Sequence, residues 1–203
     1  MSVIWLVDDD PGVLRALQRL LDAEGFETRA FPDATAFLAA HDMTLPGCAV
    51  IDLGLPDLDG LALQQRLTAE GHACPVIFLT GQGSIPAAVE AMRGGAEDFL
   101  TKPVNATALL AAIRGALVRD AEARARGDVE AQHRARLTSL TPREREVMAE
   151  VVTGRLNKQI ADRLGAAEKT IKVHRGRVMQ KMGVRSVAEL VTIWSLLKDG
   201  GAL

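Results

Sequence analysis

Four polar residues stand at the ends of apolar runs that are typical of buried strands. They are Asp8, Asp52, Thr80 and Lys102, which close or follow residues 2–7, 48–51, 76–79 and 98–101. In a parallel sheet the carboxyl ends of the strands share one edge, and ligands bind at that edge in open α/β sheets. The sequence therefore predicts one site that combines carboxylates, a hydroxyl and an amine.

Asp52 is the residue around which this site is expected to form. Val50 and Ile51 are β-branched and indicate a short buried strand, and Gly54 and Pro56 end it. A carboxylate in such a place is available for chemistry, but it is costly to keep charged without a cation or a hydrogen-bond donor nearby.

Composition indicates a globular chain with two different halves. The 203 residues are 48% hydrophobic and 25% charged, which is globular rather than disordered. Residues 1–118 carry 15 acidic and 7 basic side chains, whereas residues 138–203 carry 7 and 12. An acidic half joined to a basic half predicts two domains with different partners. Two cysteines, no signal-like segment and no apolar run of membrane-spanning length favour a reducing cytoplasm.

Residues 1–118 alternate strand and helix in five units. Pro11 and Gly12 open the first expected helix, and Asp33 and Asn105 cap two others. Further helices are expected over residues 61–70 and through Val89, after a loop at residues 81–86. Near-continuous apolar strands between helices indicate a doubly wound parallel sheet, and we choose the flavodoxin-like order 2-1-3-4-5.

Residues 119–137 differ from both neighbours. They are charged and helix-prone, apolar residues are nearly absent, and Gly127 interrupts the pattern. The stretch is interpreted as a solvated linker that is helical in part.

Residues 138–203 are predicted to form an all-α domain of four helices. Capping boxes open the first at Thr141 with Glu144 and the last at Ser186 with Glu189. Gly154, Gly165 and Gly183 separate the helices, so the expected ranges end near residues 153, 164 and 183. Two short helices joined by a tight glycine-containing turn form a helix-turn-helix motif.

The third of these helices is strongly basic. Between Glu168 and Arg185 the cations are Lys169, Lys172, Arg175, Arg177, Lys181 and Arg185, against the single Glu168. A solvated basic face is the commoner explanation of any one charge run. The adjoining turn and the core spacing of Ile171, Val178 and Met182 favour a helix that enters the major groove of DNA.

Several motifs carry a resemblance to a known family. The stretch LTGQGSIPAAVEAM at residues 79–92, Gly95-Ala96 and DFLTKP at residues 98–103 resemble a two-component receiver domain of the FixJ branch. Ile160-Ala161, KTIKVH at residues 169–174 and Lys181-Met182-Gly183 resemble a LuxR-type DNA-binding domain. Together they cover all but the linker.

The resemblance implies a role for each residue of the predicted site. Asp52 is the expected phosphoacceptor for a phosphoryl group from a sensor histidine kinase. Asp8 and Asp9 are expected to hold Mg²⁺ with Asp52 and the Gly54 carbonyl. The resemblance further implies that Thr80 and Lys102 stabilise the phosphoryl oxygens, with a cis bond before Pro103, whereas Asp10 faces elsewhere.

The DNA contacts are also implied by resemblance, with one departure. The expected contact residues are Lys158, Lys169, Thr170, Lys172, Val173, Arg175, Gly176 and Arg177. Related regulators place a basic residue one turn after Lys172-Val173, where this chain has Gly176. Arg175 and Arg177 are expected to reach phosphates instead.

The resulting prediction is a cytoplasmic response regulator whose double-stranded DNA binding depends on phosphorylation. Phe99 is expected to turn inward when Thr80 is drawn to the phosphoryl group, and an activated homodimer is expected to follow. The receiver is expected to catalyse only its own phosphoryl transfer and dephosphorylation. A haloacid-dehalogenase-type enzyme is the first alternative, but Gly54 stands where that class has a second Asp. A phosphorylation-independent regulator is the second alternative. The complete set of predicted phosphorylation-site residues argues against it: Asp8, Asp9, Asp52, Thr80 and Lys102.

Overall fold

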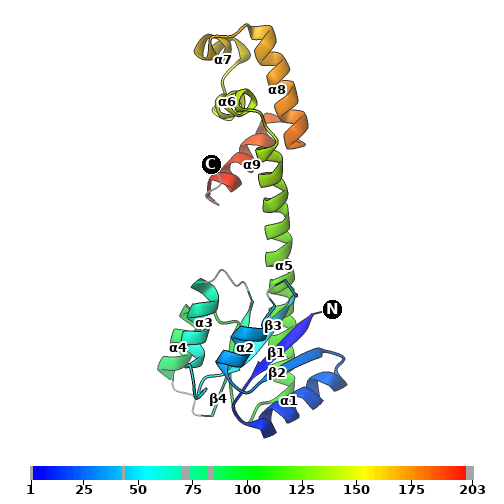
Figure 1. The fold of residues 1–203 in the computed structure, drawn as a ribbon, viewed down its shortest axis with the longest axis vertical. Helices are drawn as coiled ribbons and strands as arrows, with labels where there is room; N and C mark the ends of the chain where they lie inside the picture. Colours follow the sequence, from blue (N-terminus) through cyan, green and yellow to red (C-terminus); the bar gives the residue numbers. More distant parts are fainter. Residues whose placement is uncertain (1, 43, 70–73, 82–84, 200–203) are drawn as a thin grey trace. The chain divides into compact units, whose positions relative to one another are not determined.

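The computed structural model describes residues 2–42, 44–69, 74–81 and 85–199 (Figure 1). By its internal contacts the chain divides into two compact units, Met1–Arg124 and Ala125–Leu203. Each unit has its own buried apolar clusters. Within the described ranges, no helix combines the length and the apolar character needed to cross a membrane.

The first unit is built on a five-stranded sheet. The strands are β1 (Val3–Val7), β2 (Glu27–Phe31), β3 (Gly47–Asp52), β4 (Val76–Thr80) and β5 (Asp98–Thr101). Their order is β2-β1-β3-β4-β5 and every pairing is parallel. The predicted fold class and strand order are therefore confirmed, and the carboxyl ends of the strands share one edge of the sheet (Figure 1).

Alternating side chains of the central strands enter two separate cores. Trp5, Ile51 and Phe78 lie in one apolar cluster, whereas Leu6 and Val50 lie in the other. Successive side chains of a strand point to opposite faces, so both faces of this sheet are covered. This double burial is why the strands are near-continuous apolar runs in the sequence.

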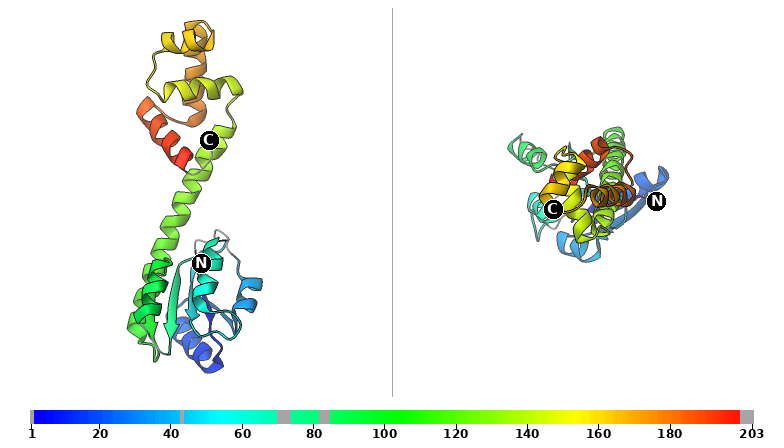
Figure 2. Two further views of the ribbon diagram at one scale, coloured as in Figure 1. Left: turned by 90° about the vertical axis from the view of Figure 1, so that its left-hand side faces the viewer. Right: turned by 90° about the horizontal axis from the view of Figure 1, so that it is seen from above.

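Helices cover the two faces of the sheet. They are α1 (Pro11–Ala23), α2 (Ala34–Ala40), α3 (Gly60–Ala69), α4 (Ile85–Arg93) and the first part of α5 (Ala106–Thr138). Phe37 of α2 and Leu63 of α3 pack on one face, and Leu21 of α1 and Ile113 of α5 pack on the other. Figure 2 shows the first part of α5 beside the sheet. Position 70 of the expected third helix and positions 82–84 of the expected loop lie outside the described residues.

The predicted interruption at Gly127 is wrong. Helix α5 continues from Ala106 to Thr138 through this glycine. A glycine within a helix costs only about 1 kcal/mol relative to alanine. The many alanines around it are strong helix formers, and Glu130 pairs with Arg134 one turn apart at 2.7 Å. These local contributions offset the cost.

Asp120 and Arg124 attach this helix to the start of β3. Asp120 is only 2% exposed, and its carboxylate accepts hydrogen bonds from Arg124 Nε and from the Gly47 amide, each at 3.0 Å. Arg124 donates in turn to the carbonyls of Thr44 and Leu45 at 3.1 and 2.6 Å. Part of the stretch predicted to be a solvated linker therefore belongs to the buried structure of the first unit.

The second unit contains the four predicted helices. They are α6 (Pro142–Val151), α7 (Asn157–Leu164), α8 (Glu168–Met182) and α9 (Val187–Asp199). Thr141 and Glu144 form the predicted capping box, and helix α6 ends two residues earlier than expected. One apolar cluster joins all four helices, and Leu137 from the last turn of α5 is part of it.

Candidate functional site

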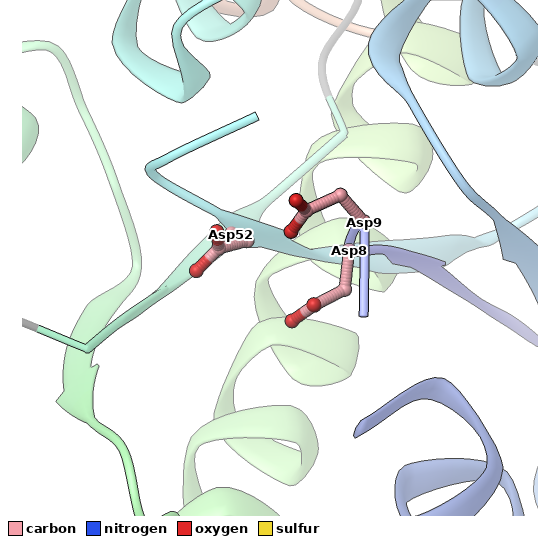
Figure 3. Close-up of side chains that lie close together, drawn as sticks. All are labelled: Asp8, Asp9 and Asp52. Carbon is pink, nitrogen blue, oxygen red and sulfur yellow. The ribbon is translucent and has the colours of Figure 1, made fainter. Parts of the chain in front are cut away.

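Strands β1 and β3 bring three carboxylates together. The strands are neighbours in parallel register, with Val7 opposite Ile51, so Asp8 and Asp52 emerge side by side. One carboxylate oxygen from each of Asp8, Asp9 and Asp52 lies within 4.8 Å of the other two. Figure 3 shows the three side chains close together. Asp8 and Asp52 are 1% and 6% exposed, whereas Asp9 is open to solvent. Two such charges 4 Å apart repel by about 4 kcal/mol at an effective dielectric of 20, so the cluster needs a cation.

Lys102 supplies one positive charge to this cluster. Its Nζ lies 2.6 Å from Asp8 Oδ2 and 2.9 Å from Asp52 Oδ1. Burial alone lowers the pKa of this amine, but the hydrogen bonds and charges of the two carboxylates outweigh it and raise the pKa above 10.5. Lys102 is therefore a fixed ammonium that points into the site. The Lys102–Pro103 peptide bond is cis, as the resemblance implied.

Thr80 and Phe99 come from the next two strands along the sheet. Thr80 closes β4, one residue beyond the pair formed by Asp52 and Leu79, and it is 5% exposed. Phe99 lies on β5 opposite Phe78, where it is partly buried against the apolar cluster that contains Trp5 and Phe78. The predicted hydroxyl is thus on β4, the strand next to β3, and the predicted aromatic is on β5, one strand further along the sheet.

Backbone and capping contacts explain two neighbours of the cluster. The Gly54 amide donates to Asp52 Oδ2 at 3.1 Å and so holds that carboxylate. Asp10 faces away, as predicted, because its carboxylate caps α1 by accepting from the amides of Gly12 and Val13 at 2.6 and 3.4 Å. An Asp directly before a proline that opens a helix is the sequence signal for that cap.

Asp57, in the loop that follows β3, was not among the predicted site residues. It lies in the loop after Asp52, and its carboxylate accepts from the hydroxyl and amide of Thr35 and from the Ala34 amide at 2.6–3.2 Å. The hydrogen bond from the Thr35 side chain is the main reason that the pKa of Asp57 falls to about 2. Asp57 therefore ties the loop that follows Asp52 to the start of α2. No local spacing signals a contact between residues 22 or 23 positions apart.

In the second unit, α7, a turn and α8 form the helix-turn-helix. Gly165 ends α7 with φ of +60°, a left-handed conformation that favours glycine. The exposed predicted contact residues of this motif are Lys158, Lys169, Thr170, Lys172, Val173, Gly176 and Arg177. Val173 is 48% exposed although it is apolar, which suits contact with a partner.

Two cations of α8 contact other helices of the second unit. Arg175 is half-buried, and its Nη1 donates to Asn157 Oδ1 of α7 at 3.0 Å. Lys181 Nζ lies 2.6 Å from Glu144 Oε2. The hydrogen bond from Lys181, followed by the bond from the Thr141 amide, lowers the pKa of Glu144 to about 2. Arg175 and Lys181 therefore also connect α8 to α7 and α6.

A parallel sheet with this acid, threonine and lysine edge, followed by a helix-turn-helix, defines a transcriptional response regulator of a two-component system. The response regulator receiver domain family matches residues 4–114, and the luxR family of bacterial regulatory proteins matches residues 138–194. The chain belongs to these families, and the resemblance to FixJ and LuxR-type regulators is confirmed.

The sequence similarity to individual relatives extends over nearly the whole chain. The transcriptional regulatory protein FixJ of Bradyrhizobium diazoefficiens is 43% identical over 191 residues, which cover 94% of this chain and 93% of FixJ. The response regulator protein TmoT of Ectopseudomonas mendocina is 42% identical over 198 residues, 98% of this chain and 90% of TmoT. The solved structure of the response regulator StyR is 42% identical with a TM-score of 0.85, over 96% of this chain and 98% of that chain.

Proposed function

We propose that Asp52 is the phosphoacceptor for a partner sensor histidine kinase. An oxygen of the Asp52 carboxylate attacks the phosphorus, and the N–P bond of a phosphohistidine breaks with its electron pair returning to the imidazole. The Lys102 ammonium and the Thr80 hydroxyl stabilise the charge on the transferred oxygens. The observation that carries this proposal is the position of Lys102 Nζ, 2.9 Å from Asp52 and 2.6 Å from Asp8. The only chemistry proposed for the receiver is this transfer and the later loss of the phosphoryl group.

We propose that the acidic cluster holds Mg²⁺, which fits this donor set. Three carboxylates gathered within 4.8 Å, two of them buried, are hard oxygen ligands with more negative charge than Lys102 neutralises. The proposed protein ligands are Asp8, Asp9, Asp52 and the backbone carbonyl of Gly54. When bound, the ion neutralises charge on the transferring phosphoryl group.

The surface around α4 is proposed to form a homodimer after phosphorylation. Val89 and Met92 of α4 are 43% and 50% exposed, and a cavity of about 470 Å³ lies among Ala88, Val89, Met92 and Arg93. Movement of Thr80 toward the phosphoryl oxygens leaves space that Phe99 can fill, which reshapes the adjoining surface. A twofold contact of this apolar patch then forms only in the active state.

Phosphorylation with acetyl phosphate and Mg²⁺ should double the mass of the full chain, measured by light scattering at roughly tens of micromolar, a concentration that detects ordinary weak interfaces. Val89→Glu should keep the phosphorylated chain monomeric because it places charge in the apolar patch. Asp52→Asn with acetyl phosphate is the matched control. A phosphorylated wild type that stays monomeric contradicts this mechanism and favours release of an inhibitory contact.

The second unit is proposed to bind double-stranded DNA through α8. Lys172 and Val173 are proposed to contact base edges with Lys169, Thr170 and Gly176 beside them, whereas Lys158 and Arg177 are proposed to contact phosphates. Arg175 is also proposed to contact a phosphate, in addition to its hydrogen bond to Asn157. Two such units in a dimer read two half-sites roughly one helical turn apart. We propose a cytoplasmic location, because both proposed partners, double-stranded DNA and the kinase that supplies the phosphoryl group, are reached from the cytoplasm.

Lys172→Ala should reduce discrimination between DNA sequences, because loss of a base contact removes about 1–3 kcal/mol of selectivity. Arg177→Ala should instead weaken all duplexes alike and reduce the salt dependence of log K by about one. Fluorescence anisotropy with a duplex selected by the wild-type protein and with a scrambled duplex separates the two effects. A uniform loss for Lys172→Ala removes this residue from the base-reading set.

The domain limits follow from these assignments. We propose residues 1–118 as the receiver domain and 138–203 as the DNA-binding domain. Residues 119–137 are proposed as a helical connection, whose first turns are held against the receiver by Asp120 and Arg124. The family matches at residues 4–114 and 138–194 support the two outer domains.

A further inference from the structure

Arg136, on the last turn of α5, contacts the end of α8. Its Nη1 donates to the carbonyl oxygen of Met182 at 3.1 Å, and Met182 is the last residue of α8. The final carbonyls of a helix have no partners within the helix, and a cation there interacts favourably with the helix dipole. Arg136 therefore caps α8 from outside that helix.

Gly183 is shaped to receive this guanidinium. It ends α8 with φ of +69°, and a Cβ placed on it would lie 2.8 Å from Arg136 Nη1 and 3.1 Å from Arg136 Cζ. Gly165 ends α7 in the same left-handed conformation with φ of +60°, but nothing lies within 4 Å of a Cβ built there. At Gly183 the missing side chain thus provides both a turn and room for Arg136.

The same end of α8 is held by two further contacts from the segment before α7. Lys181 Nζ donates to the carbonyl of Ser139 at 3.1 Å and to Glu144 Oε2 at 2.6 Å. The Glu144 residue is only 2% exposed, so this ion pair is shielded on one side. Three polar contacts with residues 136–144 therefore fix the last turn of α8.

A cavity beside Arg136 allows its hydrogen bond to Met182 to be tested separately from its packing. It has a volume of about 330 Å³ and is lined in part by His133, Arg136, Gly183 and Glu189. Arg136 is half-buried and lies beside this space, outside the apolar cluster of the second unit, so a shorter side chain at position 136 removes no core residue. Substitutions at position 136 can therefore test the hydrogen bond to Met182.

We infer that Arg136 is a positioning residue for sequence recognition by α8. Its hydrogen bond to Met182 and its fit over Gly183 fix one end of α8 against the other helices of the second unit. That fixes the direction in which the exposed Lys172 and Val173 project. Base contacts fail when side chains are displaced by about half an ångström, whereas flexible cations still reach phosphates. The inference rests on the proposed DNA-binding function. It gives Arg136, a residue of the stretch 119–137, a role in the sequence specificity of DNA binding.

The first test compares specific and nonspecific DNA binding by the full-length protein. Arg136→Ala should lower affinity for a duplex selected by the wild type by on the order of fivefold, a weakening rather than a loss of base contacts. Its affinity for a scrambled duplex and the slope of log K against log salt should stay unchanged. Arg136→Lys should recover part of the selectivity because it keeps a cationic donor, and Arg177→Ala provides the contrasting phosphate-contact pattern.

The second test measures the Arg136–Gly183 contact without DNA. Gly183→Ala should destabilise the wild-type protein more than it destabilises Arg136→Ala, because removal of the guanidinium clears the space that a Cβ needs. Gly165→Ala should cost the same in both backgrounds, since that glycine shares the backbone strain but has no neighbour within 4 Å. Chemical denaturation followed by Trp194 fluorescence, in a Trp5→Phe background, measures the stability of all six proteins: the two parents and each glycine variant in both of them.

Each outcome decides between the alternatives. An unchanged selectivity ratio in Arg136→Ala overturns the inference, and so does a fall of about one in the salt slope, which marks a direct phosphate contact. An equal loss on both duplexes with reduced helicity shows a role in folding alone. Additive costs for Gly183→Ala and Arg136→Ala exclude the contact itself. If the wild type selects no duplex over a scrambled one, the proposed DNA-binding function fails, whereas the glycine comparison still tests the contact.

Discussion

Asp52→Asn should take up no acid-labile phosphoryl group when the protein is incubated with acetyl phosphate and Mg²⁺, whereas the wild type should take up one. The amide preserves the size of the side chain and can still contact Lys102, but it has no nucleophilic carboxylate oxygen. Intact-mass measurement of the wild type and the variant gives the number of phosphoryl groups directly.

Two neighbours provide matched controls for this result. Asp10→Asn should be labelled like the wild type, because Asp10 caps α1 and asparagine is an equally good cap. Asp9→Ala should still be labelled, but only at higher Mg²⁺ concentration, since it lacks a ligand rather than the acceptor. Wild-type labelling of Asp52→Asn would move the phosphoacceptor to another residue.

Gly47→Ala should destabilise the first unit by more than about 3 kcal/mol, a large part of the stability of an ordinary domain. A Cβ at this position would lie 1.9 Å from the Val3 carbonyl oxygen and 2.7 Å from Trp5 Cζ3. The carbonyl belongs to the backbone of the neighbouring strand β1, so it cannot rotate away as a side chain does. The strands must separate, or β3 must begin later.

Denaturant unfolding followed by Trp5 fluorescence, in a Trp194→Phe background, measures this loss. Gly81→Ala is the matched control, because a Cβ there meets nothing within 4 Å and the backbone is not left-handed. Its effect should stay within about 1 kcal/mol. Equal stabilities of the two variants would show that the start of β3 can shift without loss.

The parallel strands and their polar ends could be predicted because the signals are local. A run such as Val3–Val7 is buried on both faces, so its residues are apolar without alternation, and the next residue is where the chemistry begins. The local sequence predicts each strand end separately. Because the strands of a parallel sheet end at the same edge, it follows that these polar residues lie close together. The Lys102 contacts with Asp8 and Asp52 then follow from the fold.

Contacts between distant segments could not be predicted in the same way. Asp57 reaches Thr35, and Arg136 reaches Met182, across turns whose geometry no local pattern specifies. The charge of Arg175 predicts a phosphate contact, but its hydrogen bond to Asn157 depends on how α7 packs against α8, which the sequence does not specify. Gly127 does not interrupt α5, since a single glycine is a small cost in a helix of 33 residues.

Where a protease cuts the linker should decide how stable the released receiver is. Cleavage after residue 118 removes Asp120 and Arg124, and with them the partners of the Gly47 amide and of the Thr44 and Leu45 carbonyls. An orphaned buried amide costs about 1–3 kcal/mol. A fragment that ends at residue 118 retains every group proposed for phosphoryl transfer, yet it should unfold more readily than one that ends at residue 124. The segment that carries the phosphoryl-transfer groups is therefore shorter than the segment that the receiver needs for full folding stability.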